Sequence, residues 1–564
     1  MPSKDEPLLG HHAMLSSDGR AKTSPPTNRW LVFAVQFLCM TVGLWNVSGI
    51  ASRIWAAPIV RVSRTTMCPQ QNEIYPRSNL SVKLNDLYNS HGFRVRAVQW
   101  LSGAIKVPTE SYDEMGPVGV DPRWGVFGEL HEYLAVAFPK THSTLRLTKV
   151  NTYALAYHWE GSDGSLKPIL LAGHQDVVPV DPDTISAWPY PPYSGYYDGT
   201  FIWGRGSADD KSGLIGIFSA IETLIESGFT PRRSVVIASG IDEESAGYRG
   251  AGELAIYLEK TYGKDAFAML VDEGGAITEL GGLQVAKPDV AEKGYLDVKI
   301  QIATPGGHST NPHEAHLKRT SPLYSTLLCA AEHAPDMDGH LKQELYKSVK
   351  SDRALKQVES IVFNSPDIGD IARALSTTTQ AVDFIQGGIK VNALPELATA
   401  VVNHRIAIDS SVSELTTRLT QLLEPLAAKH RLDFVSFGRN VSVLPSQNAR
   451  AFLSGALEPA PISPTDSAAY KLLSGTILAT YKESFAGRAP NDRKMIVGPG
   501  LAGGNTDTQF YWNLTRNIFR YNHLSEDSFQ AIHTVGEAIR ATAFVDGIRF
   551  FSLLIMNADE AEEL

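Results

Sequence analysis

The sequence predicts an α/β fold: a mixed sheet flanked by helices, with a smaller α+β domain inserted into the chain. Three short, mostly apolar runs, at residues 169–172, 234–240 and 268–271, have the length and composition of buried strands. Residues 213–227 carry apolar side chains at helical spacing, which predicts a helix between the first two strands. Residues 296–302 alternate between apolar and polar side chains, as a half-buried strand of a second sheet would.

The composition is that of a globular protein with more than one domain. The chain has 564 residues, of which 43% are hydrophobic and 20% are charged, so it is long enough for two domains. Its formal net charge of −10 gives no support to a nucleic-acid partner.

Imidazole and carboxylate side chains follow each of the three predicted strands, and an acidic pair precedes the predicted helix. Ligands bind at the carboxyl ends of the strands in an open α/β sheet, so these groups can meet although they are far apart in sequence. They are also the ligands that zinc takes in catalytic sites, where a carboxylate can bridge two ions. The residues concerned are His174, Asp176, Asp209, Asp210, Asp242, Glu243, Glu244 and Asp272.

Each of these motifs alone has an ordinary structural explanation. An acidic triplet is usually a solvated turn, a single histidine after a strand is usually structural, and Asp-Asp before Lys often caps a helix. Glycine occurs in or beside every one of these segments, as tight turns and close approach to a metal ion require. The combination therefore favours a site with two metal ions.

With these motifs in this order, the chain resembles the zinc aminoacylase and carboxypeptidase family, which includes glutamate carboxypeptidase, aminoacylase and carnosinase. Within that family it is most similar to the vacuolar carboxypeptidase S, or Gly-X carboxypeptidase, group. The resemblance extends from about Val95 to the C-terminal helix. The motifs that carry it lie at residues 173–179, 204–211, 242–244, 271–275, 306–309 and 532–533.

The resemblance implies two Zn²⁺ ions per subunit and a role for each residue of the site. Asp176 would orient the ligand His174 and fix its tautomer. Glu243 would be the general base, and Asp209 would bridge the metals, followed by a peptide bond that is cis in the family. The metal ligands implied are His174 and Asp272 for the first ion, Glu244 and His533 for the second, and Asp209 for both.

The last ligand needs a choice between two histidines. The family usually reads His-x-x-Asn-Glu at this point, whereas this chain has glycine at position 536 in place of the asparagine. His523, ten residues before His533, is the competing candidate. His533 is preferred because Glu537 and the helical pattern after it keep the family's order.

The inserted domain is expected at residues 293–440, with strands at 296–302 and 399–408 and a helix at 413–426. By resemblance it is a lid set between two catalytic segments, at 91–292 and 441–564, and the stretch 329–379 would enlarge it. A lid of this type can also form a homodimer. His308 would reach the substrate carbonyl. The residues expected to bind the rest of the substrate are Asn392 and Arg405, which would hold its carboxylate, and Gly504 and Asn505, which would line the same pocket.

The N-terminal region predicts a membrane anchor. Residues 1–29 are polar and would form a cytosolic tail, and the 21 residues from 30 to 50 carry no charge. At about 1.5 Å per residue this segment spans one bilayer core, which favours a signal anchor over a cleaved signal peptide or a buried helix. Residues 51–90 would be a stem, and the family resemblance suggests a vacuole or lysosome-like compartment.

Glycosylation sequons and cysteines bear on the same topology. Asn79, Asn440 and Asn513 each begin a sequon, which favours a lumenal catalytic part in a single-pass membrane protein. Of the three cysteines, only Cys68 and Cys329 lie outside the predicted membrane segment. Spacing does not decide whether they pair.

Three functions are weighed. The first is a metallo-carboxypeptidase that releases C-terminal residues from short peptides, and the second is an amidohydrolase of N-acyl amino acids, including fatty-acyl ones. The third is a non-catalytic receptor on a peptidase scaffold, which would predict loss of Glu243 or of a metal ligand. Because none of these residues is lost, an enzyme is expected.

Overall fold

The computed structural model describes residues 67–302, 316–387, 397–441, 449–484 and 494–564. The predicted tail and membrane segment, at residues 1–29 and 30–50, lie outside the described residues, and so do His308 and Asn392. In the described part, the strands form sheets of ten, six and four strands.

The ten-stranded sheet is mixed, as expected. β3, β6 and β7 are parallel to one another, whereas β1 and β2 are antiparallel additions at one edge. Its main path is β1 (Arg146–Val150), β2 (Ala154–Trp159), β6 (Val235–Ser239), β3 (Ile169–Ala172), β7 (Met269–Leu280), β18 (Ile518–Ser525), β9 (Asp289–Glu292) and β17 (Gly500–Ala502), while β8 (Leu283–Ala286) pairs with β7 and β16 (Met495–Val497) pairs with β8.

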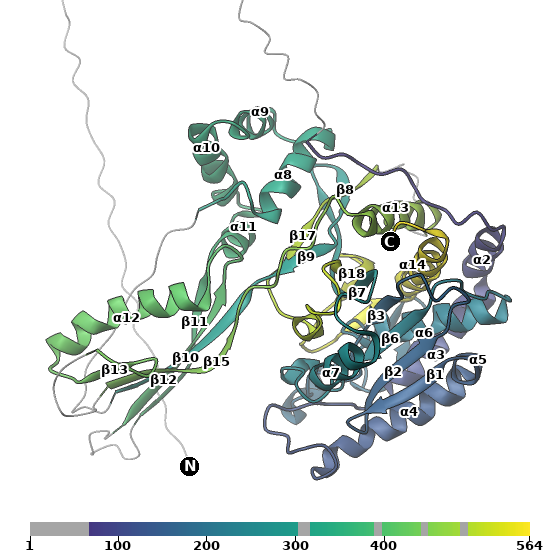
Figure 1. Cartoon of the computed structure of the whole chain (residues 1–564), viewed down its shortest axis with the longest axis horizontal. Coiled ribbons are helices and arrows are strands. Elements are labelled where there is room, and N and C mark those ends of the chain that lie inside the picture. Colours follow the sequence, from purple (N-terminus) through teal and green to yellow (C-terminus); the bar gives the residue numbers. More distant parts are fainter. Residues whose placement is uncertain (1–66, 303–315, 388–396, 442–448, 485–493) are drawn as a thin grey trace, which may run out of the picture. The chain divides into compact units, whose positions relative to one another are not determined.

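Both faces of this sheet are buried, because successive side chains of a strand point to opposite sides. On one face, Leu171 and Ile237 join the main core, which the helices of that face complete (Figure 1). On the other face, Leu170 and Val236 pack with α7 (Ala251–Tyr262). The helices that contribute to the main core are α2 (Leu80–Asn89), α3 (His91–Ile105), α4 (Val126–Ala137), α6 (Lys211–Glu226), α13 (Ala468–Glu483) and α14 (Ala541–Glu560), and the short α5 (Pro139–Thr144) packs against α6.

Helix α14 has the length and apolar composition of a membrane-spanning helix, but it is an interior helix. Of its most apolar window, 89% is buried within the protein. It packs against α6, α13 and β18. It is the only helix of the described residues that is long and apolar enough to cross a membrane.

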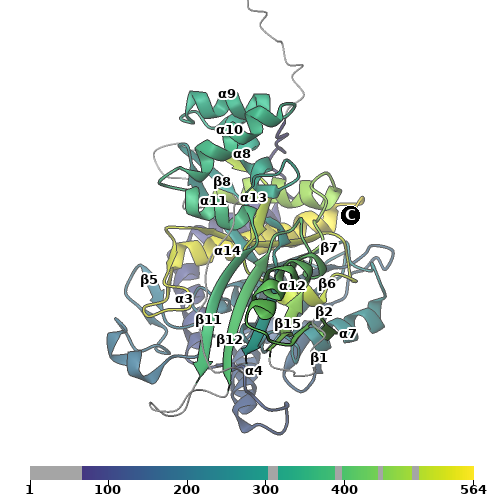
Figure 2. The same cartoon turned by 90° about the vertical axis from the view of Figure 1, so that its left-hand side faces the viewer.

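The six-stranded sheet is antiparallel apart from the β13–β15 pair, and α12 (Val412–Lys429) packs against β10, β13 and β15 (Figure 2). Leu296 and Leu415 lie in the core between the sheet and this helix. The strand order is β11 (Thr379–Gly387), β12 (Ala398–Ile406), β10 (Gly294–Ile302), β15 (Ala449–Leu457), β13 (Phe434–Ser436) and β14 (Arg439–Asn440). The boundary predicted at residue 440 is therefore too early, because β15 pairs with β10 along its length.

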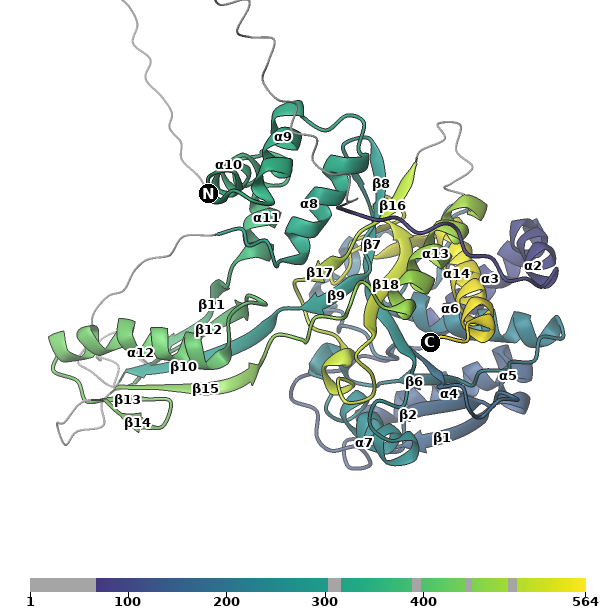
Figure 3. The ribbon, with the colours of Figure 1, turned by 45° about the horizontal axis from the view of Figure 1, so that its top comes forward.

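A cluster of four helices follows β10 in the sequence (Figure 3). It has a core of its own, which includes Leu327 and Val358. Its first helix packs with β8 residues and is joined to the N-terminal segment by a Cys68–Cys329 disulfide, with a Cα–Cα distance of 4.9 Å. The four helices are therefore attached to the ten-stranded sheet rather than to the six-stranded sheet. They are α8 (Pro322–His333), α9 (Gly339–Ser348), α10 (Asp352–Phe363) and α11 (Gly369–Ser376).

The described end of the predicted stem, residues 67–79, is bound to the catalytic part as a strap. Besides the disulfide, the Gln70 side chain makes two hydrogen bonds to the backbone of Val497, at 2.9 and 3.0 Å. The Ile74 N–H donates to the Gly475 carbonyl, and the Ile74 carbonyl accepts a hydrogen bond from the Asn557 side chain. Because it is fixed at these points, this strap is part of the folded unit, which corrects the expectation of a stem up to residue 90.

Candidate active site and metal centre

The carboxyl ends of three parallel strands bring the predicted motifs together. His174 comes two residues after β3, and Glu244 comes soon after β6 within a short 3₁₀ turn, Glu243–Ser245. Glu273 lies in β7, just beyond the point where that strand stops pairing with β3 at Leu171. Because these strands run in the same direction, their ends meet at one edge of the sheet.

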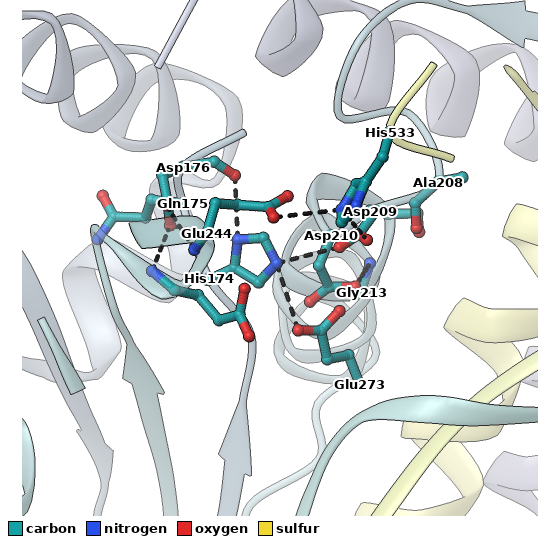
Figure 4. Close-up of polar contacts among 12 residues, drawn as sticks. His174, Gln175, Asp176, Ala208, Asp209, Asp210, Gly213, Glu244, Glu273 and His533 are labelled. Carbon is teal, nitrogen blue, oxygen red and sulfur yellow. Dashed lines mark hydrogen bonds and ion pairs between the residues drawn. The ribbon is translucent and has the colours of Figure 1, made fainter. Parts of the chain in front are cut away.

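Asp209 lies between the two histidines. Its Oδ1 is 3.1 Å from His174 Nε2, and its Oδ2 is 3.1 Å from His533 Nε2 (Figure 4). The following residue, Asp210, caps α6 by accepting the Gly213 N–H at 3.2 Å. The Asp209–Asp210 peptide bond is cis, as the resemblance implied. The arrangement of Asp209 is that of a carboxylate able to bridge two ions.

His533 is presented by a turn of the four-stranded sheet, whose order is β19 (Phe529–Gln530), β20 (Ala538–Arg540), β5 (Phe201–Trp203) and β4 (Tyr196–Tyr197). The Glu537 carboxylate holds this turn to the Asp209 segment, accepting the N–H groups of Ala208 at 2.9 Å and of Asp209 at 3.2 Å. Gly536 has φ of 86°, a left-handed conformation that glycine adopts without strain. The glycine that departs from the family pattern therefore suits the turn that carries the ligand.

Two sets of three ligand atoms each fit around one ion, and they share Asp209. The first set is His174, Asp209 and Glu273, and the second is Asp209, Glu244 and His533; the ligand atoms of each set lie within 4.8 Å of one another. Glu243 and Glu244 form a further group with His174. The centre is open to solvent at His533, whose side chain is 51% exposed, whereas that of Asp209 is only 19% exposed.

The structure differs from the expectation at one ligand: Glu273, not Asp272, stands beside His174, with Oε1 3.3 Å from Nε2. Neighbouring side chains in a strand point to opposite faces. Val271 contributes to the core on the α6 side and Leu270 to the core on the α7 side. Glu273 therefore points with Val271 toward α6 and Asp209, and Asp272 points away.

The competing histidine has a different environment. His523 is buried in β18, where its Nδ1 lies 2.9 Å from the Tyr521 hydroxyl and its ring stacks on Phe550. Burial lowers the pKa of His523 to about 3. The geometry thus favours His533 over His523 as the ligand.

Asp176 organises the site in a way that the sequence did not reveal. Its carboxylate lies 3.3 Å from His174 Nδ1, and it also accepts the backbone N–H groups of Glu243 and Glu244, both at 3.1 Å. A fourth contact comes from the buried Ser111 hydroxyl, which donates to Oδ2 at 2.6 Å. Ser111 was missed because it stands far from every motif, and no local pattern distinguishes it from an ordinary serine.

The electrostatics of this centre suit divalent cations. Burial raises the pKa of Glu273, and the charge of Asp209 raises it further. Hydrogen bonds with Asp209 and Glu244 raise the pKa of His533 to about 10. The raised pKa values of these buried carboxylates and of the neighbouring histidine indicate negative charge that the protein does not neutralise. Bound metal ions would neutralise it. Imidazole nitrogen and carboxylate oxygen are also the donors that zinc takes.

Glu243 stands beside the two ligand sets without belonging to either. Burial raises the pKa of its carboxyl well above the ordinary value, and the charges of Asp507, Glu244 and Asp209 add to this. A carboxyl whose proton affinity is raised in this way is suited to accept and return a proton.

Three of the four residues predicted to bind the substrate, Arg405, Gly504 and Asn505, lie among the described residues. Arg405, in β12, donates from Nη1 to Asn505 Oδ1 at 3.2 Å. Asn505 in turn donates from Nδ2 to the Lys293 carbonyl at 2.6 Å, where the chain passes from β9 to β10. Gly504 is exposed beside Asn505. Arg405 and Asn505, which were predicted separately for the substrate pocket, therefore contact each other.

Comparisons with known proteins identify the family of this chain. The family described as peptidase family M20/M25/M40 matches residues 170–557. Carboxypeptidase S of Saccharomyces cerevisiae is 36% identical over 521 residues, which cover 87% of this chain and 89% of that protein. The mouse N-fatty-acyl-amino acid synthase/hydrolase PM20D1 is 33% identical over 492 residues, with 83% and 89% covered. Human carnosine dipeptidase 1 has the same fold, with a TM-score of 0.54 at 14% identity over 86% of this chain and 100% of that one. The chain therefore belongs to the M20/M25/M40 peptidase family.

Proposed function

We propose that this protein is a zinc-dependent carboxypeptidase that releases C-terminal amino acids from short peptides. The observation that carries the proposal is the shared position of Asp209 between two ligand sets, with Glu243, which belongs to neither of these two sets, beside them. The identity of 36% to carboxypeptidase S over most of both chains supports the same function.

Two Zn²⁺ ions would be held by His174, Asp209 and Glu273 and by Asp209, Glu244 and His533. Such ions polarise the scissile carbonyl and lower the pKa of a water molecule toward neutrality. The contribution of the chain is to fix the ligands. Asp176 holds His174 in orientation through Nδ1 and holds Glu244 through its backbone, so both ligand sets depend on this single carboxylate.

Glu243 would move the proton. It would accept a proton from the attacking water and donate it to the amine that leaves. The backbone of Glu243 is fixed by Asp176, so the base is positioned by the same group that orients the ligand His174. His308, which lies outside the described residues, is proposed to stabilise the developing oxyanion.

Arg405 would recognise the free carboxylate of the residue that is released. A guanidinium can bind a carboxylate through two parallel hydrogen bonds, which fixes both position and orientation. The contact with Asn505 holds Arg405 in place for this task. Asn392, outside the described residues, is proposed to share it, in a lid built on the six-stranded sheet.

Paired substrates test this proposal. A blocked dipeptide with a free C-terminal carboxylate should be cleaved, and its C-terminal amide should be cleaved at least about 100-fold less well, because Arg405 would lose its charged partner. Arg405→Ala should reduce cleavage of the acid far more than that of the amide. Arg439→Ala, which changes an exposed arginine of the same sheet, is the control and should keep the wild-type ratio. Equal cleavage of acid and amide by the wild type would rule the proposal out.

Hydrolysis of N-acyl amino acids is the second candidate, and the 33% identity to mouse PM20D1 favours it. Both reactions break an amide beside a free carboxylate, so they would use the same metals and Arg405. Assaying the purified protein on a blocked dipeptide and on a fatty-acyl amino acid with the same C-terminal residue separates them. The carboxypeptidase proposal expects a higher kcat/KM for the dipeptide.

For localisation, we propose a signal anchor at residues 30–50 with the catalytic part in the lumen of a vacuole-like compartment. The uncharged run of 21 residues supports the anchor. The full-length protein should then stay in membranes during alkaline carbonate extraction. A mature N-terminus just after residue 50 would instead indicate a cleaved signal peptide.

A further inference from the structure

An exposed tyrosine stands close to the catalytic carboxyls. Tyr248 follows the turn that carries Glu243 and Glu244, and it is 61% exposed. Its loop is firmly held, because the Asp242 carboxylate accepts the N–H groups of Arg249 at 2.9 Å and Gly250 at 2.7 Å. The loop therefore holds the Tyr248 ring at the surface, a few residues from the carboxyls of the site.

Tyr248 packs on one aromatic side chain, and a second lies near it. Its ring lies edge-on to that of Phe510, with centroids 5.3 Å apart. Phe510 ends the 3₁₀ turn Asp507–Phe510, which begins two residues after Asn505. Tyr295 is half-buried, and burial, followed by the nearby Tyr248 phenol, raises its pKa. Three aromatic residues from separate parts of the chain thus meet here.

Tyr295 connects this group to the proposed carboxylate site. In the β10–β12 pair, Tyr295 is directly opposite Arg405, so the two side chains project from the same face of the sheet. In this position the positive charge of Arg405 acts against the rise in the pKa of Tyr295. On the other side of Tyr295, Gly455 in β15 has no side chain that would crowd the tyrosine ring. A Cβ at position 455 would lie 3.2 Å from the ring.

We propose that Tyr248, Tyr295 and Phe510 form the surface that receives the side chain of the C-terminal residue that is released. This inference rests on the proposed function, because it requires Arg405 to hold that residue's carboxylate. A side chain attached next to that carboxylate then lies beside Tyr295 and reaches Tyr248 and Phe510. Aromatic faces favour apolar and aromatic side chains, which lose contact with water there, over charged ones. The substrates are therefore peptides that end in a leucine-like or phenylalanine-like residue.

The test compares substrates that differ only in the last side chain. Blocked dipeptides ending in leucine, phenylalanine, glycine or aspartate, all with a free carboxylate, are assayed for kcat/KM with the metal-loaded protein. The wild type should prefer leucine or phenylalanine to glycine by about tenfold or more, because burial of an apolar side chain is worth at least this much. In Tyr248→Ala, this preference should fall by about tenfold, mainly through KM. Tyr248→Phe should retain most of it, because it keeps the ring.

A matched variant controls for the loss of any exposed tyrosine. Tyr196 is also exposed and stacks on Tyr190, with centroids 4.1 Å apart, in the sheet that carries His533. Tyr196→Ala should leave the leucine-to-glycine ratio within about twofold. An unchanged ratio in Tyr248→Ala, with normal folding by circular dichroism, would overturn the inference alone. If the wild type cleaves none of the free-acid dipeptides, the proposed function fails instead.

Discussion

The carboxylate of Asp176 accepts the backbone N–H of Glu243 at 3.1 Å while its Oδ1 lies 3.3 Å from His174 Nδ1. One buried acid thus orients a metal ligand and positions the proposed base. The same carboxylate therefore contacts a residue of each kind, one that would bind metal and one that would transfer the proton.

The first prediction isolates the base. Glu243→Gln keeps a side chain of the same size and leaves both ligand sets intact, so the variant should bind the same amount of metal as the wild type. Turnover should fall by about 10²–10⁴-fold, the usual contribution of general-base catalysis. Metal content is measured by plasma emission and turnover by amine release. Glu132→Gln, at an exposed position of α4, is the control.

The second prediction decides between two adjacent acids. Glu273→Gln should lower the zinc content toward one ion per chain, because Glu273 Oε1 lies 3.3 Å from His174 Nε2. Asp272→Asn should retain both ions, since this side chain points to the other face of the sheet. The reverse outcome, with zinc lost only in Asp272→Asn, would show that the family assignment of Asp272 holds in the metal-loaded protein.

The third prediction concerns the strap. A chain that begins at residue 67 should be soluble and active, because every contact of residues 67–79 is kept. A chain that begins at residue 80 should lose activity much faster on heating, since it lacks the contacts with Val497, Gly475 and Asn557. Cys68→Ser in the longer chain should be destabilised by roughly 2–5 kcal/mol, the usual effect of removing a native disulfide. Equal thermal inactivation rates for all three proteins would show that the strap contributes nothing.

The fourth prediction concerns acid stability. His131 is buried, with Nε2 2.9 Å from Gln175 Oε1 and Nδ1 2.9 Å from the Lys149 ammonium. Burial, followed by the charge of Lys149, lowers the pKa of His131 to about 4. In the unfolded chain the same group titrates near ~6.5, so as the pH falls the unfolded state takes up the proton first. The free energy of unfolding should therefore decrease from about pH 6.5 down to about pH 4, by up to roughly 3 kcal/mol from this residue, and should not change for this reason above that window.

The measurement for His131 is urea unfolding at several pH values. His131→Gln removes the titrating group and should flatten the slope between pH 6.5 and 4. His340→Gln, at an exposed position of α9, should leave the slope as it is in the wild type. A slope that survives in His131→Gln would assign the pH dependence to other groups.

The sequence predicted the site best where a strand ends in a motif. The structure brings His174 and Glu244 close to Asp209, because apolar runs locate strand ends and parallel strands bring their ends together. The choice between Asp272 and Glu273 was not accessible in this way. It depends on which face each side chain of β7 occupies, and a run that is buried on both faces carries no alternation to reveal it.

Other features depend on contacts between distant segments. Ser111 reaches Asp176 only because the chain after α3 passes beside residues 175–177, which follow β3, and nothing in its local sequence indicates that approach. The strap at residues 67–79 reads as a polar, proline-containing linker, and only its partners show that it is fixed. The predicted boundary at residue 440 put β15 in the catalytic part. Its pairing partner β10 lies more than a hundred residues earlier in the chain, so no local pattern indicates that the two strands pair.

The position of α14 at the centre of the main core has a consequence for synthesis on the ribosome. This helix is the last element of the chain, yet it packs against α6, whose N-terminus carries Asp209. The apolar face of α6 therefore stays uncovered until residues 541–560 have been synthesised. Because His533 stands only eight residues before α14, the main core and the metal centre are completed at nearly the same stage of synthesis.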